Sequence, residues 1–450
     1  MDQRNDTHTS PLPPGLKRSL NLFDLTMIAT GSVIGSGIFL TPSLIASKLP
    51  SPFWMLSIWI LGGVMALTGA LTFAELGAMM PHAGGVYVYL SETYGQWVGF
   101  LYGWSYFLVT NTGGIAALGI AFATYLGYFI ELSPTEVKAV AIGGIAFLTI
   151  LNVRGVKVGA IFSDLFTLLK LIGICGLIVV GLAWKSSSGI NFSAFGPTSP
   201  TFGISALAVA MVGVIWSCGG WQHASFTAGE AKTPQRDVPL SMILGALIVM
   251  VIYVLTNIAY LRLLTPAQMA AAPRVASAAM EMVLGPVGGS LIALVIFIST
   301  FGTAGIYTMT APRIYFAMAR DKIFFQRVAD IHPRYRTPAV AIVLQSLWAV
   351  VLILFWGTFE NLISYVVFTD AIFFALTALA VFILRWRCPD VVRPYRTFGY
   401  PITPIFFIAL EVWFVVTIIF EKPAQSLAGI GFLLLGIPVY FSWRRKQLQM

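Results

Sequence analysis

The chain has 450 residues, of which 58% are hydrophobic and only 10% are charged, and its mean hydropathy is +0.84. Soluble domains carry roughly a quarter of their residues as Asp, Glu, Lys or Arg, so this composition excludes a water-soluble globular protein and indicates a surface that faces lipid. The formal net charge of +9 does not indicate a nucleic-acid partner, because the basic residues gather in alternate loops, as the positive-inside rule expects of a membrane protein.

Twelve apolar runs are long enough, or nearly so, to cross about 30 Å of hydrocarbon as helices. They cover residues 22–45, 53–80, 97–130, 137–153, 160–184, 204–228, 240–263, 287–312, 339–356, 361–384, 402–421 and 425–443. The fourth run is the shortest. Because the basic loops alternate with others, we expect a multi-pass protein of the plasma (cell inner) membrane, with both termini cytoplasmic.

The segments between the spans leave no room for a separate soluble domain. Residues 1–16 are polar and contain three prolines, and we expect a disordered cytoplasmic N-terminus. Residues 17–443 then form a single transmembrane domain, and 444–450 form a basic cytoplasmic tail. The longest outer loops are expected at 185–203 and 264–286.

Two spans carry sequences that favour a break in the helix. Five of the seven residues from Gly31 to Gly37 are Gly or Ser, and the sixth span holds Gly219 and Gly220 near its middle. Each glycine weakens a helix interior by about 1 kcal/mol relative to alanine. Interrupted spans at corresponding positions of two inverted units point to a transporter binding site at the bilayer midplane. The alternative for Gly31 and Gly35 is close helix packing through a G-x-x-x-G motif.

Several motifs together resemble the amino acid–polyamine–organocation superfamily, and within it the L-type amino acid transporters. The resemblance runs from Leu16 to about the tenth span. Its motifs are Gly31-Ser32-Val33-Ile34-Gly35-Ser36-Gly37-Ile38-Phe39, Ala74-Glu75-Leu76-Gly77 with Ala83-Gly84-Gly85-Val86-Tyr87, Asn152-Val153-Arg154-Gly155 with Lys170, and Gly219-Gly220-Trp221 with Glu230. This resemblance implies two inverted five-helix repeats, about 17–184 and 204–385, with peripheral helices at about 402–443. It also implies alternating access by the rocking of a helix bundle against a scaffold.

A broken helix suits the two charged groups that all amino acids share. The second half of the first span begins near Ser36, and its free backbone N–H groups carry the positive end of the helix dipole. We therefore expect the substrate carboxylate on the amides of Ser36, Gly37 and Ile38, where the glycines at 35 and 37 allow close approach. The ammonium is expected on carbonyls at the ends of the first half-helices. These positions are Val33, Trp216 and Gly219, and Gly35 is also expected among the substrate-binding residues.

Trp216 precedes the second break, and the resemblance implies an aromatic gate over the substrate at this position. The alternative is a tryptophan anchored at the membrane interface, but its place in mid-span argues against this.

Ionisable side chains inside spans are costly and usually functional or paired. Lys170 lies near the middle of the fifth span, and we expect its ammonium on carbonyls near Gly35 and Ser36. The resemblance implies that it replaces a sodium ion held between helices 1 and 8, although Ser299 and Thr300 could supply sodium-binding hydroxyls. The alternative is a lysine that snorkels to the interface.

Other ionisable residues also lie within or near the spans. Asp164 and Asp370 lie within spans, and Asp370 is a candidate for proton coupling. Glu411 lies outside the expected core and is interpreted as structural. Glu75 and Arg313 lie nearer the cytoplasmic ends, where ion pairs are expected.

The sequence thus predicts a sodium-independent amino-acid exchanger in the lipid bilayer, with Lys170 and Trp216 as coupling and gating residues. A proton-coupled symporter of the same fold is the alternative, and a polyamine transporter or a channel are further ones. The four histidines, His8, His82, His223 and His332, are scattered, so we expect no metal, no cofactor and no enzymatic activity. None of the three cysteines lies in an outer loop, and we expect no disulfide-linked accessory subunit.

Overall fold

The fold is all-helical, as predicted. The computed structural model describes residues 16–184, 203–355 and 359–448, and within these ranges it holds no strand, only an isolated bridge between Leu20 and Ala231. The predicted disorder at 1–15 and most of the outer loop at 185–203 lie outside the described residues. Leu16, the first described residue, is buried against Ala83 and Phe316.

The helices follow one another along the chain with few long connections. In order they are α1 (Leu22–Val33), α2 (Gly37–Lys48), α3 (Pro52–Met79), α4 (Val86–Tyr94), α5 (Gln96–Ser105), the π-helix η1 (Tyr106–Thr110), α6 (Asn111–Leu126), α7 (Pro134–Val153), α8 (Val156–Ala183), α9 (Ile204–Cys218), α10 (His223–Phe226), the 3-10 helix η3 (Ala228–Glu230), α11 (Pro234–Leu263), α12 (Pro266–Ala271), α13 (Val275–Leu284), α14 (Pro286–Thr310), α15 (Pro312–Arg320), the 3-10 helix η4 (Gln326–Ala329), α16 (Ala339–Phe355), α17 (Phe359–Arg387), α18 (Ile402–Glu421) and α19 (Pro423–Leu448).

The predicted spans are all helical, but two of them are short. Within the described residues, ten helical segments are long and apolar enough to cross a membrane. The sixth and ninth predicted spans correspond to α9 and α16, which are apolar but shorter. The outer loop expected at 264–286 is instead largely helical, because α12 and α13 fill it. Thr265 starts α12 through a capping box with Gln268. At the C-terminus, α19 continues to Leu448, past the predicted boundary at 443.

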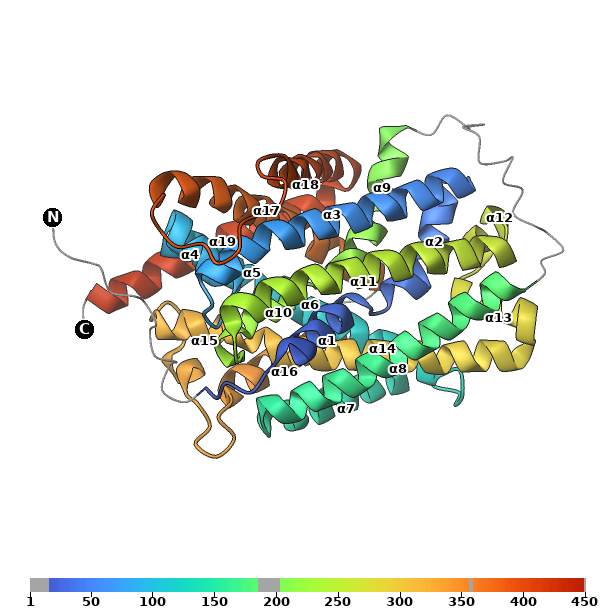
Figure 1. Ribbon diagram of the computed structural model, residues 1–450. Helices are drawn as coiled ribbons and strands as arrows, with labels where there is room; N and C mark the ends of the chain where they lie inside the picture. The colour runs from blue at the N-terminus through green and yellow to red at the C-terminus, as the bar shows by residue number, and fades with distance from the viewer. Residues whose placement is uncertain (1–15, 185–202, 356–358, 449–450) are drawn as a thin grey trace.

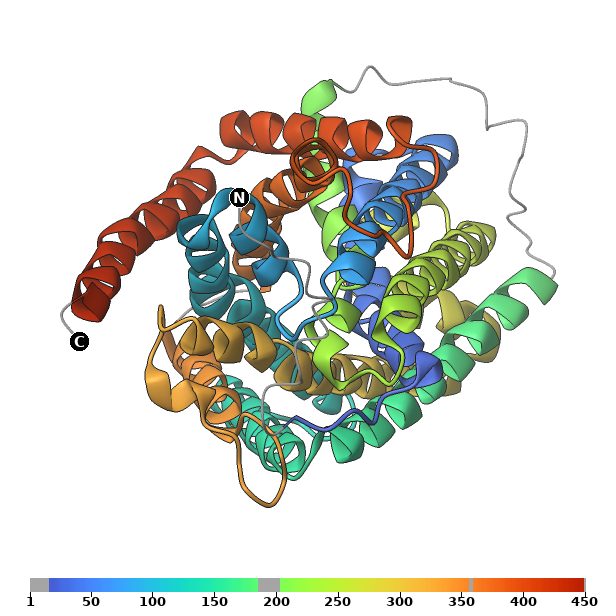
Figure 2. The same cartoon turned by 60° about the vertical axis from the view of Figure 1, so that its left-hand side comes forward.

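Helices from the two halves of the chain pack against each other in matching pairs (Figures 1 and 2). The second helix of each predicted repeat, α3 and α11, lie side by side, and so do the third helices, α6 with α14. The broken helices pair as α2 with α9 and α1 with α10. This arrangement is what an in-plane two-fold relation between inverted repeats produces. The exact repeat boundaries stay a prediction.

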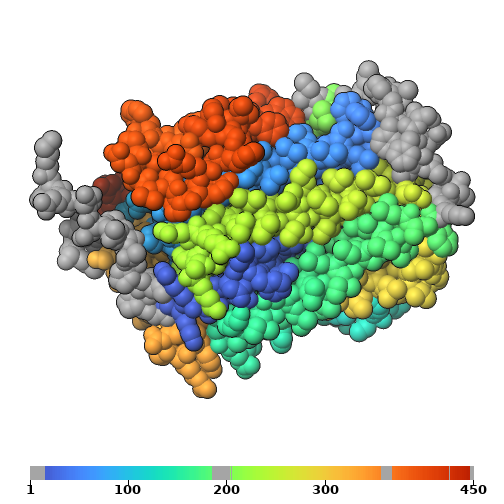
Figure 3. All heavy atoms as spheres, viewed as in Figure 1, coloured from blue at the N-terminus to red at the C-terminus, as the bar shows by residue number. Residues whose placement is uncertain are grey.

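The two helices after the repeats lie at the periphery. α18 packs on α17, α3 and α9, while α19 packs on α5 and α17. Figure 2 shows both, in red, at the outer edge of the bundle. On another face, α1 lies between α11 and α8, as Figure 3 shows, and most of its residues are buried.

The helix α8 shows how sequence sets which side faces lipid. Ile161, Leu165, Ile172 and Val179 are all more than half exposed, at spacings that keep them on one helical face. The opposite face carries the polar groups Ser163, Thr167 and Lys170, which are fully buried against the rest of the bundle. A helix that lies between lipid and a polar interior is expected to have an apolar outer face and a polar inner face. The inner face of α8 directs Lys170 toward α1.

Candidate functional site

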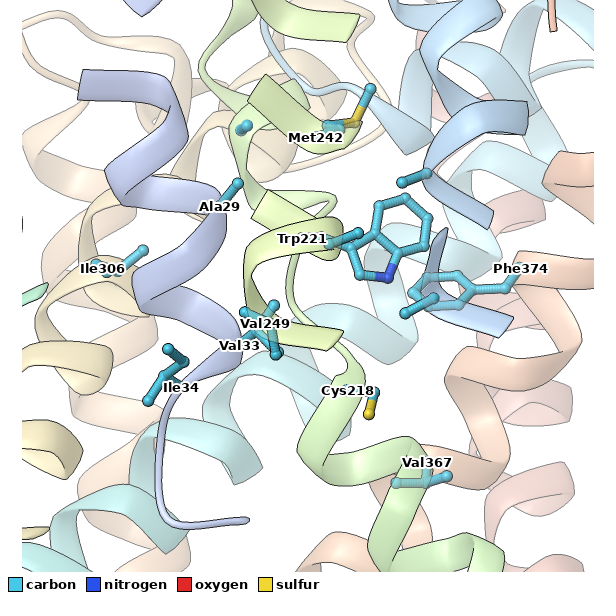
Figure 4. Close-up of a cluster of buried hydrophobic side chains, with 14 of the residues drawn as sticks. Ala29, Val33, Ile34, Cys218, Trp221, Met242, Val249, Ile306, Val367 and Phe374 are labelled. Carbon is cyan, nitrogen blue, oxygen red and sulfur yellow. The ribbon is translucent and has the colours of Figure 1, made fainter. Parts of the chain in front are cut away.

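The first span breaks where glycine and serine accumulate. α1 ends at Val33 and α2 begins at Gly37, so residues 34–36 are unwound, and Figure 4 shows the chain leaving α1 just after Val33 and Ile34. Unwound backbone inside a membrane protein must find partners for its polar groups, since lipid offers none. The partners in this protein come from α8, α11 and α14.

Lys170 supplies the main partner from α8. Its Nζ donates to the carbonyl oxygens of Gly31 at 2.9 Å and Ile34 at 2.7 Å, and it lies 2.7 Å from Oγ1 of Thr303. The side chain is fully buried, which rules out snorkelling to an interface. The expected location at the helix-1 break is therefore correct. Ile34 belongs to the unwound segment next to Gly35, and Gly31, within the last turn of α1, is an additional partner.

Two hydroxyls of α14 complete this cluster. Ser299 Oγ donates to the carbonyl oxygens of Ile34 and Gly35, both at 3.0 Å. Thr303 Oγ1 lies 2.9 Å from the carbonyl oxygens of Gly31 and Ile34. Thr300, the other hydroxyl that the sequence suggested for a sodium site, bonds only within its own helix. The ammonium, two hydroxyls and three carbonyls thus form one polar cluster, which we call the Lys170 cluster.

The second break lies at residues 219–222, between α9 and α10. Gly220 has φ of +120°, which only glycine adopts readily. A Cβ at this position would lie 2.8 Å from the carbonyl oxygen of Ser32. Ser32 Oγ in turn donates to the carbonyl oxygen of Gly220 at 2.7 Å. The second break therefore contacts the last turn of α1, just before the first break, a relation that the sequence did not reveal.

The start of α2 has the open amides that the carboxylate site requires. No described residue accepts a hydrogen bond from the backbone N–H of Ser36, Gly37 or Ile38, as expected for the first turn of a helix. Ser36 Oγ is also buried without a hydrogen-bond partner. An orphaned hydroxyl beside three free amides is a place where a ligand oxygen would satisfy several donors at once.

Two neighbouring positions differ from the expectation. The carbonyl oxygen of Val33 already accepts a hydrogen bond from Tyr253 Oη at 3.1 Å, so it is engaged. At Gly37, an added Cβ would lie 2.7 Å from Cα of Ser217. Gly37 is thus a close-packing position between α2 and α9 in addition to being the first residue of α2.

A small cavity lies beside the second break. Trp216 and Gly219, both predicted site residues, lie on its wall, together with Gly220, Tyr307 and Asp370. None of Val33, Gly35, Ser36, Gly37 and Ile38 lines it, and all five are buried. The helix-6 half of the predicted site therefore faces open space, whereas the helix-1 half is closed in this conformation.

A π-helix supplies residues that the sequence analysis missed. η1 interrupts the third span, and its first and last residues, Tyr106 and Thr110, line the cavity. π-helical turns inside α-helices are frequent at functional sites. Tyr106 Oη lies 3.1 Å from Nε2 of His223, whose Nδ1 lies 2.5 Å from Oγ1 of Thr310. His223 is thus a packed polar residue, as interpreted from the sequence, but it also faces the cavity.

Glu411 is not peripheral in its contacts. It lines a second small cavity, whose wall includes Gly62 and Met65 of α3. Gly219 and Phe374 line both cavities, so the two spaces adjoin. Glu411 and Asp370 each keep one buried carboxyl oxygen without a hydrogen-bond partner. Glu411 lies on α18, outside the ten predicted core helices as the sequence indicated, and its side chain reaches the cavity because α18 packs directly on α3 and α9.

The remaining ionisable residues mostly form ion pairs, as expected. Glu75 accepts two hydrogen bonds from Arg385, at 2.9 and 2.7 Å. Arg313 donates to both carboxylate oxygens of Glu230, at 2.9 and 2.8 Å, and both side chains are at most 1% exposed. Asp164 keeps one buried oxygen without a partner.

The apolar walls around the breaks are built by aromatic packing. Figure 4 shows Trp221, from the second break, facing Phe374 of α17, and their ring centroids lie 5.9 Å apart. Within the described residues, no cluster of three or more His, Cys, Asp or Glu could hold a metal ion. The three cysteines are unpaired in the structure.

Comparison with known proteins shows close relatives over almost the whole length. A family model described as "Amino acid permease" matches residues 20–441. The "Serine/threonine exchanger SteT" of Bacillus subtilis (strain 168) is 32% identical over 436 residues, covering 96% of this chain and 98% of that protein. The human "b(0,+)-type amino acid transporter 1" is 28% identical, covering 99% and 93%. The human "Large neutral amino acids transporter small subunit 2" is 28% identical, covering 96% and 82%.

Proposed function

The chain belongs to the amino acid permease family and is an amino-acid transporter; we propose that it works as a sodium-independent exchanger by alternating access. We further propose that it resides in the cell membrane with both termini cytoplasmic, because the basic loops alternate as the positive-inside rule requires.

The Lys170 cluster is the observation that carries sodium independence. A sodium ion between a broken helix 1 and helix 8 needs carbonyl and hydroxyl oxygens as ligands. Here the carbonyl oxygens of Gly31 and Ile34 and the hydroxyl of Thr303 surround the ammonium of Lys170. A second cation at the same oxygens would meet the ammonium at close range, and like charges in a desolvated site repel strongly. Transport through this site therefore needs no added cation.

The free amides at the start of α2 support recognition of an α-carboxylate. Three backbone donors and the orphaned Ser36 hydroxyl would hold the carboxylate at the positive end of the α2 dipole. Gly219 borders the cavity, and its backbone carbonyl would accept a hydrogen bond from the substrate ammonium. The cavity does not reach these amides, because Ser36, Gly37 and Ile38 are buried and do not line it. Binding would thus require the two breaks to open, which fits a mechanism in which the substrate reorganises the site.

Exchange rather than net uptake rests on the relatives. The Bacillus relative bears the name of a serine/threonine exchanger, and we propose exchange of small neutral amino acids such as serine and threonine for this chain. Obligatory exchange means that the empty protein reorients slowly, so bound substrate must stabilise the reorienting state.

Purified protein in liposomes tests this proposal. Vesicles are loaded with 5 mM serine or with buffer alone, and uptake of labelled serine is measured with sodium or choline outside. We expect rapid uptake only with internal serine and equal rates in the two cations. Equal uptake without internal serine, or uptake only in sodium, would contradict the proposal.

Proton-coupled symport is a second candidate, favoured by the two carboxyls beside the cavities. Asp370 and Glu411 have unpartnered buried oxygens, and buried carboxyls without a counter-charge tend to bind protons. The same vesicles with buffer inside and an inward proton gradient separate the two mechanisms. Accumulation of serine that collapses when a protonophore is added would favour the symporter over the exchanger.

A further inference from the structure

The cavity beside the second break has one polar wall that the binding of an amino acid's shared groups does not use. The carboxylate and ammonium are assigned above to the helix breaks. Asp370 of α17 and Thr110 of η1 lie elsewhere on the cavity wall. This polar wall, formed by Asp370 and Thr110, is the feature that the proposed transport mechanism leaves unexplained.

Both residues have polar atoms that make no hydrogen bond of normal geometry. Thr110 Oγ1 and one carboxyl oxygen of Asp370 are buried in this way, and the two side chains lie close enough to interact with each other. Thr110 is only 4% exposed. Leaving such atoms unsatisfied costs free energy, and native proteins rarely do so without a reason. A ligand that occupied the cavity could supply the missing partner.

Two nearby polar side chains at the second break already have partners. The ring nitrogens of His223 lie within hydrogen-bond distance of Tyr106 and Thr310. Gln222 accepts a hydrogen bond from the backbone N–H of Gly220. Among the described residues, no Lys or Arg lines the cavity beside Asp370. A molecule inside the cavity can therefore supply a further donor to this carboxyl.

The rest of the lining limits what such a molecule can be. Trp216, Tyr307 and Phe374 present aromatic rings to the same space, and Ile215 and Val367 add aliphatic surface. Aromatic walls with one polar patch fit a small molecule that is apolar along its body and carries a single donor. The side chain of an amino acid bound at the helix breaks meets this description.

We propose that Asp370 and Thr110 form a side-chain subsite that selects substrates whose side chain carries a hydrogen-bond donor, a hydroxyl or an ammonium. The subsite rests on the proposed function, because it presumes that an amino acid's shared groups bind at the breaks. Asp370 accepts the donor, and Thr110 can donate to the hydroxyl oxygen or accept from an ammonium. Aliphatic substrates of the same size leave both protein groups unpaired and therefore bind more weakly.

Matched pairs of amino acids isolate the side-chain donor. Threonine and valine differ by a hydroxyl in place of a methyl group, and lysine and norleucine differ by a terminal ammonium. Ligand-induced thermal stabilisation of the purified protein reports affinity without requiring transport. In the wild type we expect at least one donor-bearing member to bind about tenfold more tightly than its apolar partner, as one hydrogen bond predicts. Equal affinities within both pairs would overturn the subsite.

Variants of Asp370 identify which donor is recognised. Asp370→Leu keeps the approximate size of the side chain but removes its acceptor. The two members of each amino-acid pair should then bind this variant with nearly equal affinity. Asp370→Asn keeps a carbonyl acceptor, so it should retain preference for threonine over valine but lose preference for lysine over norleucine. Thr110→Val is isosteric and removes only the hydroxyl. It should reduce the affinity of the preferred donor-bearing amino acid, relative to its apolar partner, by about threefold or more. Unchanged ratios in Asp370→Leu and Thr110→Val would reject the subsite even if both proteins are stable.

Thr377→Val provides the matched control. Thr377 also lies on α17 and is buried, but its hydroxyl bonds within the helix to the carbonyl oxygen of Phe373 and does not line the cavity. We expect this variant to show the same affinity ratio within each amino-acid pair as the wild type. Should wild-type protein discriminate within the pairs yet fail to exchange serine in vesicles, the subsite would stand while the proposed exchange would fall.

Discussion

The ammonium nitrogen of Lys170 lies 2.7 Å from the carbonyl oxygen of Ile34, the first residue beyond the end of α1. This contact joins α8 to the unwound segment, so it links the lipid-facing scaffold helix to the helix whose break forms the site. Any movement of α1 relative to α8 must either break this contact or carry the lysine with it.

Lys170→Ala should therefore slow exchange by at least about tenfold while changing substrate affinity less. Loss of the ammonium leaves the carbonyl oxygens of Gly31 and Ile34 with fewer donors, a penalty of about 1–3 kcal/mol. Initial exchange rates and thermal-shift affinities, measured on the same preparation, separate the two effects. Lys138→Ala, a change of the same kind near the start of α7, serves as the control. An exchange rate unchanged in Lys170→Ala would remove the lysine from the mechanism.

Gly220→Ala should abolish exchange. The φ of +120° disfavours any side chain, and the new Cβ would lie 2.8 Å from the carbonyl oxygen of Ser32. The contact between the second break and α1 cannot then persist. Gly176→Ala makes the same substitution on α8 where a Cβ meets nothing within 4 Å, and it should be active. Vesicle exchange assays of the two variants, with folded protein quantified by size-exclusion chromatography, give the comparison. Wild-type exchange by Gly220→Ala would show that the close approach is dispensable.

Trp216→Ala should weaken apparent affinity by about tenfold, and Trp216→Phe should be milder. Trp216 lines the cavity, and its ring reaches to 4.0 Å from a Cβ built at Gly114 of α6. A phenyl ring keeps a flat apolar cover, whereas alanine removes it and leaves an unfilled space. Concentration dependence of exchange distinguishes affinity from turnover. Trp97→Ala removes an indole that is 52% exposed and should leave exchange unchanged. Identical kinetics in Trp216→Ala and wild type would assign Trp216 to packing alone.

Glu230→Gln should lower thermal stability strongly. Its carboxylate accepts two hydrogen bonds from Arg313, and the pair is almost fully buried. Removing one partner of such a pair typically costs about 3–5 kcal/mol because the other charge stays buried. The melting temperature in detergent measures this, with the exposed Glu92→Gln as the control. A melting temperature equal to that of the control would mean that the arginine finds another partner.

Local composition explains which parts of the site could be predicted. The breaks at 34–36 and 219–222 follow from glycine and serine within spans, because helix propensity is a local property. The burial of Lys170 follows from its depth in an apolar run, since a charge there must find partners. Its actual partners, Gly31 and Ile34, depend on the rotation of α1 against α8, which no local pattern encodes.

Long-range packing explains what the sequence did not reveal. Tyr106 and Thr110 reach the cavity because the third span contains a π-helical turn, and its register depends on neighbouring helices. Glu411 was assigned to a peripheral helix, yet α18 packs on α3 and α9 and brings it to the second cavity. The contact between Ser32 and Gly220 joins residues 188 positions apart. Such relations appear only once the chain is folded.

The covalent attachment of the Lys170 ammonium to α8 has a consequence for energetics. A bound sodium ion can leave with its substrate and thereby carry charge across the bilayer, whereas a lysine side chain cannot. Swapping two zwitterionic amino acids through such a site moves no net charge, so membrane voltage neither drives nor opposes the cycle. The direction of flux is then set by the concentrations of the exchanged amino acids alone.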